Sequence, residues 1–514
     1  MNTRHLLACA LLCASLALAQ PPRRDASAEP PTDSAASTRT PFPAPPAVEK
    51  LSTTQHSVTA GGQKIPYTAT TGTLVLKKDD GKPLASIFFI AYTRDDATDK
   101  SKRPVTFTFN GGPGSSSVWL HMGAFGPRRV AMPPEGTQPA PPYRLVENDD
   151  TALTFTDLVF IDPVTTGFSR NAPGEDPKQF HGLEGDLESV GEFIRLYTTR
   201  FDRWSSPKFL AGESYGTTRA AGLSEHLLGK GIFLNGITLI SSILNFETAS
   251  FAVGNDLSYI LFLPSYTATA WYHKKLPADL SGSLTKALDE ARHFASGEYS
   301  AALMKGDKLP APERAAIARK LARLTGLSTQ YVEQSNLRIN IQRFTKELLR
   351  GEGRTLGRYD SRLEGIDIDA AGERGEYDPS YSSVYGAYTA SFNDYVRTEL
   401  KYETDMPYEV LTGKVQPWSF ARYQNRYVNV AELLRQAMTQ NPNLKLMVAN
   451  GYYDLATPFF ATEYTMDHLG LDPSLSGNVH LTYCEAGHML YTKKSCLDAL
   501  HKEMESFYRS ALGQ

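Results

Sequence analysis

The chain has 514 residues, of which 41% are hydrophobic and 21% are charged, and its formal net charge is −3. This composition is that of a globular protein and excludes disordered, collagen-like and coiled-coil chains. The near balance of 53 basic against 56 acidic residues gives no bulk electrostatic reason to bind nucleic acid or an anionic membrane. Four cysteines are too few for a disulfide scaffold, and they show no paired C-x-x-C zinc pattern.

The first 19 residues have the features of a secretory signal peptide. Arg4 supplies a positive charge, an apolar run covers residues 6–18, and Ala17-Leu18-Ala19 forms an A-x-A site with cleavage after Ala19. The run is too short for a spanning helix of about 20 residues, and no later stretch is long enough either. We therefore expect a secreted or periplasmic protein with no membrane span. Leu6-Leu7-Ala8-Cys9 resembles a lipoprotein box, but its apolar stretch is too short for us to favour an anchor.

The next segment, residues 20–48, is predicted to be a disordered, proline-rich leader. Residues 20–46 contain eight prolines and only one aromatic residue, Phe42. Such a segment cannot bury enough apolar surface to offset the entropy lost on ordering.

Residues 49–245 are predicted to be the first part of an α/β core. Strand-like runs cover residues 72–76, 86–93, 105–109, 158–161 and 208–211. Between the last two, apolar residues keep helical spacing at Leu183, Leu187, Val190, Ile194 and Tyr197. Strands that alternate with helices predict a mostly parallel sheet covered by helices.

The pattern changes between residues 246 and 415, where strand signals are sparse. Ile317, Leu321 and Leu324 mark one amphipathic helix, and Ile341, Phe344 and Leu348 mark another. Strand-like runs return at 444–449 and 479–483. We therefore expect a mainly helical cap insertion at 246–415 and the second part of the core at 416–514.

The strongest local motif is Gly212-Glu213-Ser214-Tyr215-Gly216, which matches G-x-S-x-G. It follows the predicted strand 208–211 and precedes a helix with Ala220, Leu223 and Leu227 on one face. A strand, a tight turn and a helix are the setting of a nucleophile elbow, in which the turn brings backbone too close for side chains at the flanking glycines. The motif predicts Ser214 as a nucleophile.

A nucleophilic serine needs a base and an acid that orients the base. Asp454 follows the strand 444–449, and His488 follows the strand 479–483, so both are placed at the carboxyl ends of strands. His480 is the rival base, but it falls inside the predicted strand and cannot easily reach a site built from loops. We predict Ser214, Asp454 and His488 as the catalytic residues.

The reaction also needs N–H donors for the charge that develops on the carbonyl oxygen. One donor should be the backbone N–H of Tyr215, the residue after the nucleophile. The other should come from the glycine-rich turn Asn110-Gly111-Gly112-Pro113-Gly114-Ser115-Ser116-Ser117, which follows the strand 105–109. The alternative, a phosphate-binding loop, lacks the required G-K-[ST] sequence.

Together these motifs resemble the serine carboxypeptidase family of α/β hydrolases. The resemblance rests on residues 110–117, Phe160-Ile161-Asp162-Pro163-Val164-Thr165-Thr166-Gly167-Phe168-Ser169, residues 212–216, Asp454 and His488, and it runs from about residue 50 to the C-terminus. It implies an α/β-hydrolase fold with a mostly parallel central sheet and a helical cap insertion.

The resemblance also implies removal of C-terminal residues from peptides through an acyl-enzyme on Ser214. It places oxyanion donors at Gly112 and Tyr215, and a clamp for the free carboxylate of the substrate at Asn110, the Gly111 N–H and Glu213. A peptide carboxylate beside Glu213 would form a like-charge pair in which one member must be protonated. We therefore expect peptide hydrolysis to be favoured at acidic pH.

The sequence departs from the family pattern in the clamp. The family usually has a Trp two residues before the Asn and a Glu after the glycine-rich turn, where this chain has Thr108 and Ala124. The Cys that often follows the Pro-Gly is Ser115, so its disulfide is absent. The family also includes acyltransferases and hydroxynitrile lyases. The alternatives are therefore an esterase or acyltransferase with the same triad and, in another class, a catalytically silent binding protein.

Two further features of the sequence lie near this site. Signal cleavage would leave two cysteines, Cys484 and Cys496, on either side of His488, and an oxidising compartment favours a disulfide between them over two free thiols. Four tyrosines of the insertion either pack in the core or surface, which we favour, or face the substrate cleft: Tyr377, Tyr381, Tyr385 and Tyr388. The expected partner is a peptide substrate, the mechanism needs no metal or organic cofactor, and the sequence does not indicate an oligomeric state.

Overall fold

The computed structural model of the protein describes residues 46–514. The predicted signal peptide and nearly all of the predicted leader lie outside the described residues. The first element is the strand β1, Lys50–Ala60, which pairs with β2, Gln63–Lys77, in an antiparallel hairpin.

The described chain is organised around a 10-stranded sheet with the order β1-β2-β3-β7-β4-β9-β10-β13-β14, with β8 paired to β3. Strands β1, β2, β3 and β7 pair antiparallel, and the strands from β7 through β14 pair parallel. The other members are β3 Pro83–Arg94, β4 Val105–Phe109, β7 Asp157–Ile161, β8 Arg170–Asn171, β9 Lys208–Ser214, β10 Gly236–Ser242, β13 Lys445–Gly451 and β14 Val479–Cys484. Two small hairpins lie outside this sheet: β5 Arg128–Val130 with β6 Leu145–Glu147, and β11 Thr355–Leu356 with β12 Glu364–Gly365.

The burial of the strands agrees with their central or edge position in the sheet. Every residue of β4, β7 and β10 is buried, as expected for parallel strands with helices on both faces. The edge strand β1 alternates exposed with less exposed residues and covers only one face. The predicted fold class, α/β with a mostly parallel central sheet, is confirmed.

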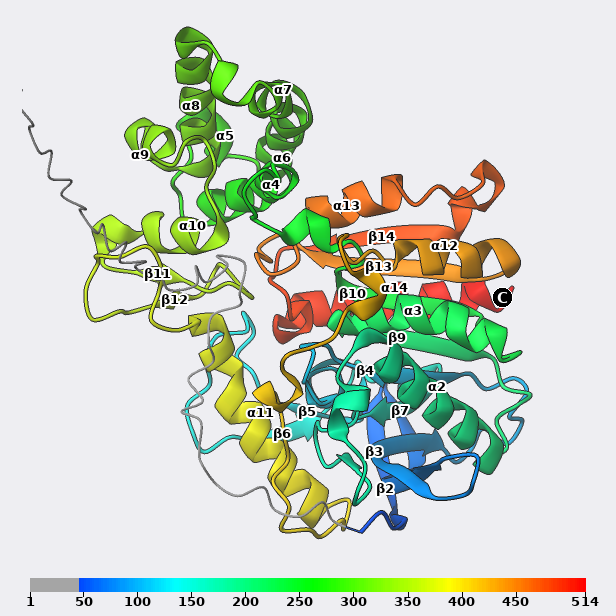
Figure 1. Cartoon of the computed structure of the whole chain (residues 1–514). Helices are drawn as coiled ribbons and strands as arrows, with labels where there is room; N and C mark the ends of the chain where they lie inside the picture. Colours follow the sequence, from blue (N-terminus) through cyan, green and yellow to red (C-terminus); the bar gives the residue numbers. More distant parts are fainter. Residues whose placement is uncertain (1–45) are drawn as a thin grey trace, which may run out of the picture.

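Helices cover both faces of the sheet. On one face a hydrophobic cluster joins the strands to α2, Leu183–Arg200, α3, Tyr215–Gly229, and α12, Ala431–Gln440. On the other face a second cluster joins them to α1, Val118–Leu120, α11, Pro379–Thr398, and α14, Lys494–Ala511. Figure 1 shows α2, α3 and α12 running alongside the strands.

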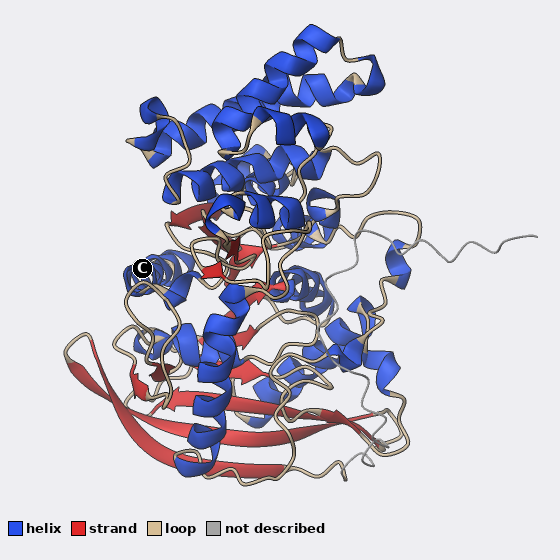
Figure 2. Cartoon of the chain, turned by 90° about the vertical axis from the view of Figure 1, so that its left-hand side faces the viewer, coloured by secondary structure: helices blue, strands red, loops and turns tan. Residues whose placement is uncertain are grey.

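The helices of the insertion stand beyond one end of the sheet, next to α13, Phe459–Asp467 (Figure 1). Figure 2 shows this helical part on the side of the molecule opposite the long antiparallel strands. Its members are α4 Leu257–Tyr272, α5 Ala278–Ser281, α6 Leu284–Phe294, α7 Ser300–Met304, α8 Ala311–Thr325, α9 Thr329–Gln334 and α10 Ile341–Glu347. They share a hydrophobic cluster of their own.

The last helix of the predicted insertion, α11, belongs to a different layer. Its buried residues, among them Val384, Tyr388 and Phe392, pack in the same cluster as the sheet and α14. The mainly helical cap predicted for residues 246–415 therefore includes a helix that packs on the core, because its apolar face is directed at the sheet and not at the other cap helices.

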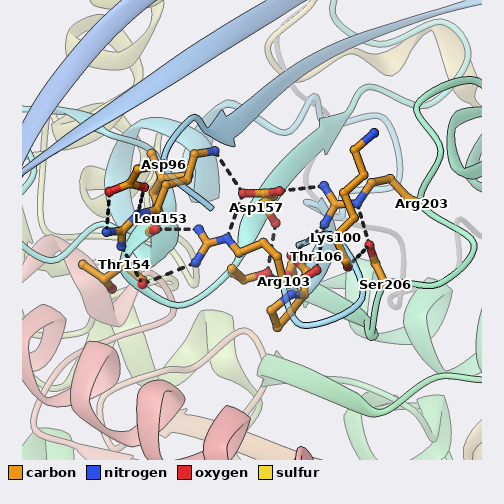
Figure 3. Close-up of polar contacts among 12 residues, drawn as sticks. Asp96, Lys100, Arg103, Thr106, Leu153, Thr154, Asp157, Arg203 and Ser206 are labelled. Atoms are coloured by element: carbon orange, nitrogen blue, oxygen red, sulfur yellow. Dashed lines mark hydrogen bonds and ion pairs between the residues drawn. The ribbon is translucent and has the colours of Figure 1, made fainter. Parts of the chain in front are cut away.

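The start of β7 is fixed by a buried charge cluster around Asp157 (Figure 3). Its carboxylate accepts hydrogen bonds from Arg103 Nε at 3.0 Å and Arg203 Nη1 at 2.6 Å, and from the backbone N–H of Arg94 at 3.1 Å. A buried carboxylate needs such partners, since an unpaired buried charge is strongly destabilising. The cluster lies at the amino ends of β4 and β7, the opposite end of the strands from the residues predicted to be catalytic.

Two further features of residues 46–514 bear on the sequence predictions. None of the helices there is long and apolar enough to cross a membrane. Cys484 and Cys496 form a disulfide with their Cα atoms 5.9 Å apart, which links the end of β14 to the start of α14.

Candidate active site

The G-x-S-x-G motif lies where β9 meets α3. Ser214 ends the strand and caps the helix with φ 59° and ψ −130°, a strained conformation for a residue with a side chain. A Cβ on Gly212 would lie 2.2 Å from the Gly216 carbonyl oxygen, so the turn leaves no room for side chains at the flanking positions. The motif therefore forms the elbow that its sequence predicts, and it exposes part of Ser214 while Glu213 stays buried.

Asp454 and His488 are brought together from the loops after β13 and β14. His488 Nδ1 lies 2.8 Å from Asp454 Oδ2, and both residues are buried. The other oxygen of Asp454 accepts the backbone N–H groups of Ala456 at 2.7 Å and Thr457 at 3.0 Å. The Thr457 hydroxyl donates to Asp454 Oδ2 at 2.7 Å. Four donors therefore fix the position of this carboxylate beside the imidazole.

The surroundings of His488 act on its pKa in two directions. Burial by itself lowers the pKa of the imidazole, but the charge and hydrogen bond of Asp454 outweigh burial and raise it above its usual value. Its second nitrogen, Nε2, is buried and has no hydrogen-bond partner within residues 46–514. The Ser241 hydroxyl donates to the His488 carbonyl at 2.6 Å, and β10 ends at Ser242, which pairs with Ser214. His488 is thus held at the strand end beside the elbow.

The glycine-rich turn after β4 packs directly on the elbow. A Cβ on Gly111 would lie 2.3 Å from the Tyr215 backbone nitrogen, an approach that only glycine allows. Gly112 has φ +99°, which also favours glycine. Tyr215 is the first residue of α3, and N–H groups in the first turn of a helix have no partner within the helix. The two predicted oxyanion donors, Gly112 and Tyr215, therefore belong to backbone segments in contact.

Buried side chains fix this turn from behind. The Arg219 guanidinium of α3 donates to the Asn110 carbonyl at 2.6 Å and to Asp186 Oδ2 at 2.8 Å. Ser117, at the far end of the turn, donates its backbone N–H to Asp162 Oδ1 at 2.8 Å. This contact joins the turn to the 160–169 motif, which explains why both motifs accompany the elbow in the sequence.

Glu213 lies beneath the elbow in a network of neutral donors. Its Oε2 accepts hydrogen bonds from Asn110 Nδ2 at 3.1 Å and from the Tyr491 hydroxyl at 2.5 Å. Burial raises the pKa of Glu213 to about 7, although His488 and the two hydrogen bonds oppose that increase. Near neutral pH this side chain can therefore exist as a carboxylic acid that donates a hydrogen bond.

The two residues that depart from the family pattern are both buried. Thr108 is buried in β4, and Ala124 is buried in the π-helical turn His121–Phe125. Glu213 is instead bound by the hydroxyl of Tyr491, a residue that no motif in the sequence indicates. Thr457 was also missed. Each follows a predicted catalytic residue by three positions, and that proximity was the only signal in the sequence that could have indicated them.

A segment of the insertion packs on the loops that carry Asp454 and His488. The backbone N–H of His488 donates to the Tyr359 carbonyl at 2.6 Å, and that of Leu455 donates to the Arg358 carbonyl at 3.0 Å. The Tyr359 ring lies 5.1 Å from the imidazole, centroid to centroid, and the Arg358 guanidinium lies 4.4 Å from the Tyr359 ring centroid. The charge of Arg358 acts to lower the pKa of His488.

The four tyrosines of the insertion divide between packing and exposure. Tyr388 is buried and its ring lies 5.1 Å from that of Trp119, whereas Tyr377 and Tyr385 are 45% and 42% exposed. The Tyr381 ring lies 5.1 Å from that of Tyr385 and 6.4 Å from that of Tyr359, with both pairs tilted. A line of rings therefore runs from the surface toward His488.

Two other site candidates can be placed. His480 lies in β14 with its side chain 56% exposed, 3.1 Å from Glu503 Oε2, and so away from the elbow. In the part of the chain that the structure describes, no group of three or more His, Cys, Asp or Glu side chains is arranged to hold a metal ion.

Comparison with known proteins adds the family. A family model described as serine carboxypeptidase matches residues 62–489, which is most of the chain. The chain belongs to the serine carboxypeptidase family. The matched region includes the glycine-rich turn, the elbow, Asp454 and His488, and this assignment confirms the resemblance seen in the motifs.

Individual relatives match over shorter stretches. Serine carboxypeptidase-like 34 of Arabidopsis thaliana is 28% identical over 191 residues, 34% of this chain and 35% of that protein. Pheromone-processing carboxypeptidase KEX1 of Saccharomyces cerevisiae is 33% identical over 135 residues, 25% of this chain and 17% of that protein. The matches thus span about a third or less of the length of these relatives.

A solved structure shares the fold over a longer part of the chain. The prohormone-processing carboxypeptidase Kex1 of Saccharomyces cerevisiae superimposes with a TM-score of 0.54 at 18% identity, covering 86% of this chain and 91% of that one. At this identity the likeness concerns the fold alone, which is that of an α/β hydrolase.

Proposed function

We propose that the protein is a serine-type carboxypeptidase that releases C-terminal residues from peptides through an acyl-enzyme on Ser214. The observation that carries this proposal is the buried Asp454–His488 pair, joined at 2.8 Å and held at the strand end beside a strained Ser214. Family membership supports the reaction class, and the site chemistry supports the residues.

In the acylation step Ser214 Oγ attacks the carbonyl carbon of the last peptide bond, and His488 Nε2 accepts the hydroxyl proton. Nε2 is suited to this role because Nδ1 is committed to Asp454 and Nε2 has no other partner in residues 46–514. The oxyanion that forms would accept the N–H groups of Gly112 and Tyr215. The charge on the imidazolium is stabilised by Asp454.

The intermediate then collapses, and His488 returns its proton to the amine of the leaving residue. Water, deprotonated by the same imidazole, attacks the acyl-enzyme, so that the peptide acid leaves and the Ser214 hydroxyl is regenerated. Apo sites often have longer hydrogen bonds between nucleophile and base than the reacting complex has.

Selectivity for a free C-terminus would come from Asn110, the Gly111 N–H and Glu213. Glu213 Oε2 accepts two hydrogen bonds, which leaves Oε1 to carry a proton toward the carboxylate of the substrate. Because its pKa is raised to about 7, Glu213 would serve as this donor at acidic and neutral pH and would repel the substrate when ionised. This is why we expect peptide hydrolysis to be favoured at acidic pH.

The proposal also includes the location of the enzyme and the division of its chain into core and cap. The pattern of residues 1–19 supports a secreted or periplasmic enzyme, cleaved after Ala19. We propose that residues 246–415 form the cap over a site built from the core segments 49–245 and 416–514, since residues 358–359 contact the loops of Asp454 and His488.

The test is a panel of N-blocked dipeptides with free and with amidated C-termini, together with simple esters, assayed with the wild type and with Ser214→Ala. We expect cleavage of the free acids well above that of the amides, and no activity in Ser214→Ala. Equal cleavage of free and amidated peptides would refute the carboxypeptidase assignment, and activity that survives in Ser214→Ala would refute the triad.

The alternative enzyme, an esterase or acyltransferase with the same residues, is favoured by one observation: Thr108 and Ala124 supply none of the clamp residues usual in the family. Ester turnover without peptide turnover in the same panel would select it. Binding of these substrates with no turnover of any of them would select the catalytically silent binding protein.

A further inference from the structure

Behind the Glu213 network lies a cavity of about 130 Å³. This volume exceeds the roughly 30 Å³ that one water molecule occupies in the liquid and is enough for a short side chain. Its wall includes Gly123, Arg129, Met132, Tyr388, Tyr491 and Lys494. None of the residues that line it is acidic.

The charge of this cavity comes from Arg129. Lys494 is already paired with Asp150 at 2.8 Å and with Asp498, so its charge is compensated. Arg129 makes no ion pair within residues 46–514, and its Nε is buried without a hydrogen-bond partner. A guanidinium with an unused donor at a cavity wall is suited to a carboxylate, which it can bind through two parallel hydrogen bonds.

The direction of Arg129 follows from its place in β5. Neighbouring residues of a strand point to opposite sides, and Arg128 points away from the cavity to bind the Glu399 carboxylate through Nε at 3.1 Å and Nη2 at 2.9 Å. β5 therefore carries Arg128, which is paired with Glu399, on one side, and Arg129, which has no ion pair in residues 46–514, on the other.

Two tyrosines of the cavity wall, Tyr388 and Tyr491, connect the cavity to the predicted active site. The Tyr491 hydroxyl contacts Glu213, the residue before Ser214. A Cβ on Gly123 would lie 2.5 Å from both the Tyr388 hydroxyl and the Tyr491 ring, so the missing side chain is what lets the two rings meet there. Burial raises the pKa of Tyr388, and the charge of Glu213 adds to this effect while that of Arg129 opposes it, so the charges of both groups act on Tyr388.

We propose that this cavity receives the side chain of the C-terminal residue of the substrate and that Arg129 selects an acidic one, aspartate or glutamate. The inference rests on the proposed function: with the main-chain carboxylate at Asn110 and Glu213, the side chain of the same residue would extend past Tyr491 and Tyr388. Arg129 is then a specificity residue that contacts the leaving residue and takes no part in bond breaking.

The test compares N-blocked dipeptides that end in Glu, Gln and Leu, with the wild type, Arg129→Gln and Arg129→Lys. We expect kcat/KM for the Glu peptide to exceed that for the Gln peptide at least tenfold in the wild type, and this preference to vanish in Arg129→Gln. Arg129→Lys should keep part of the preference, because it keeps the charge. The matched control is Arg128→Gln, which removes the same charge from the adjacent position and should keep the full preference.

A binding measurement separates this inference from the proposed function. In Ser214→Ala, calorimetry should give tighter binding of the Glu peptide than of the Gln peptide, and Arg129→Gln should remove the difference. Cleavage of all three peptides with no preference for Glu would overturn the inference and leave the carboxypeptidase intact. An equal loss on all three in Arg129→Gln would overturn it as well, because it would place Arg129 on the main-chain carboxylate or in the fold. No cleavage of any free acid would overturn the proposed function itself.

Discussion

The backbone N–H of His488 donates to the carbonyl oxygen of Tyr359 at 2.6 Å, and this hydrogen bond ties the predicted base to the insertion. Tyr359 and His488 also place their rings 5.1 Å apart. Ser361 adds a second contact of the same kind, since its N–H donates to the Tyr453 carbonyl at 3.1 Å. The insertion is therefore hydrogen-bonded to the loops of both Asp454 and His488.

This contact can be disturbed without touching a side chain of the site. A Cβ on Gly487 would lie 2.4 Å from the Tyr359 carbonyl oxygen and 2.5 Å from Asp360 Cβ. We expect Gly487→Ala to shift the His488 loop and to lower kcat by about 100-fold, since a misplacement of about 1 Å costs this much. Single-turnover kinetics on a good peptide or ester substrate measure it.

The control is Gly477→Ala, because a Cβ at Gly477 has no atom within 4 Å. It should leave kcat unchanged. Wild-type kcat in Gly487→Ala, with the protein folded by circular dichroism, would show that the contact with Tyr359 does not position His488.

A substitution at Thr457 tests whether the hydrogen bonds around Asp454 position its carboxylate. Its hydroxyl donates to Asp454 Oδ2 at 2.7 Å, the same oxygen that faces His488. Thr457→Val keeps the shape and removes the donor, and we expect kcat to fall about tenfold with KM nearly unchanged, since a hydrogen bond to a charged group is lost. Thr465→Val is the matched control, because among the described residues the Thr465 hydroxyl binds only the Ala461 carbonyl of the same helix, at 2.8 Å. An unchanged kcat in Thr457→Val would exclude a positioning role.

The sequence predicted those parts of the fold that depend on local pattern. The strands β4, β7, β9 and β14 and the helices α2, α3 and α8 contain the predicted runs, and β13 begins at Lys445, one residue after the start of its predicted run. The edge strand β1 was missed because half of its residues face solvent and carry no apolar signal. The helix α10 ends at Glu347, one residue before the predicted Leu348, since helix ends depend on capping more than on periodicity.

For the candidate site, motifs indicated residues that a single segment carries, and they gave no sign of the residues that packing brings beside them. The elbow, the glycine-rich turn, Asp454 and His488 can be predicted because each comes directly after a strand that the sequence indicates. Tyr491, Arg129 and Tyr359 come from different elements, and only the folded chain places them around Glu213 and His488. No spacing in the sequence encodes such a contact.

The disulfide gives a prediction about stability. Cys484 and Cys496 are 12 positions apart, and closing a loop of this length stabilises the folded state by about 3 kcal/mol in the chain-entropy model. We expect the double variant Cys484→Ser, Cys496→Ala to lose about this much free energy of unfolding, measured by urea denaturation. Reductant should lower the stability of the wild type by a similar amount and leave the variant unchanged. A variant as stable as the oxidised wild type would contradict the prediction.

The raised pKa of Glu213 predicts the pH dependence of activity. The protonated acid, present below about pH 7, donates to the carboxylate of the substrate, and ionisation above that pH removes the donor. Peptide kcat/KM should therefore fall as pH rises through 7, while ester kcat/KM should not. In Glu213→Gln, which keeps a donor but does not titrate, the fall for peptides should disappear. The same fall for esters and peptides would assign it to another group.

The same shift predicts how stability depends on pH. The folded state holds the Glu213 proton up to about pH 7, whereas the unfolded state releases it near the ordinary value of 4.5. Between these values the folded state binds more protons, so the contribution of Glu213 to stability falls as pH rises and levels off above 7. The loss is on the order of 3 kcal/mol. We therefore expect the free energy of unfolding of the wild type, relative to Glu213→Gln, to decrease by up to this amount between pH 4.5 and pH 8. Denaturation curves at both pH values measure it, and a difference that does not change with pH would show that Glu213 ionises normally in the folded protein.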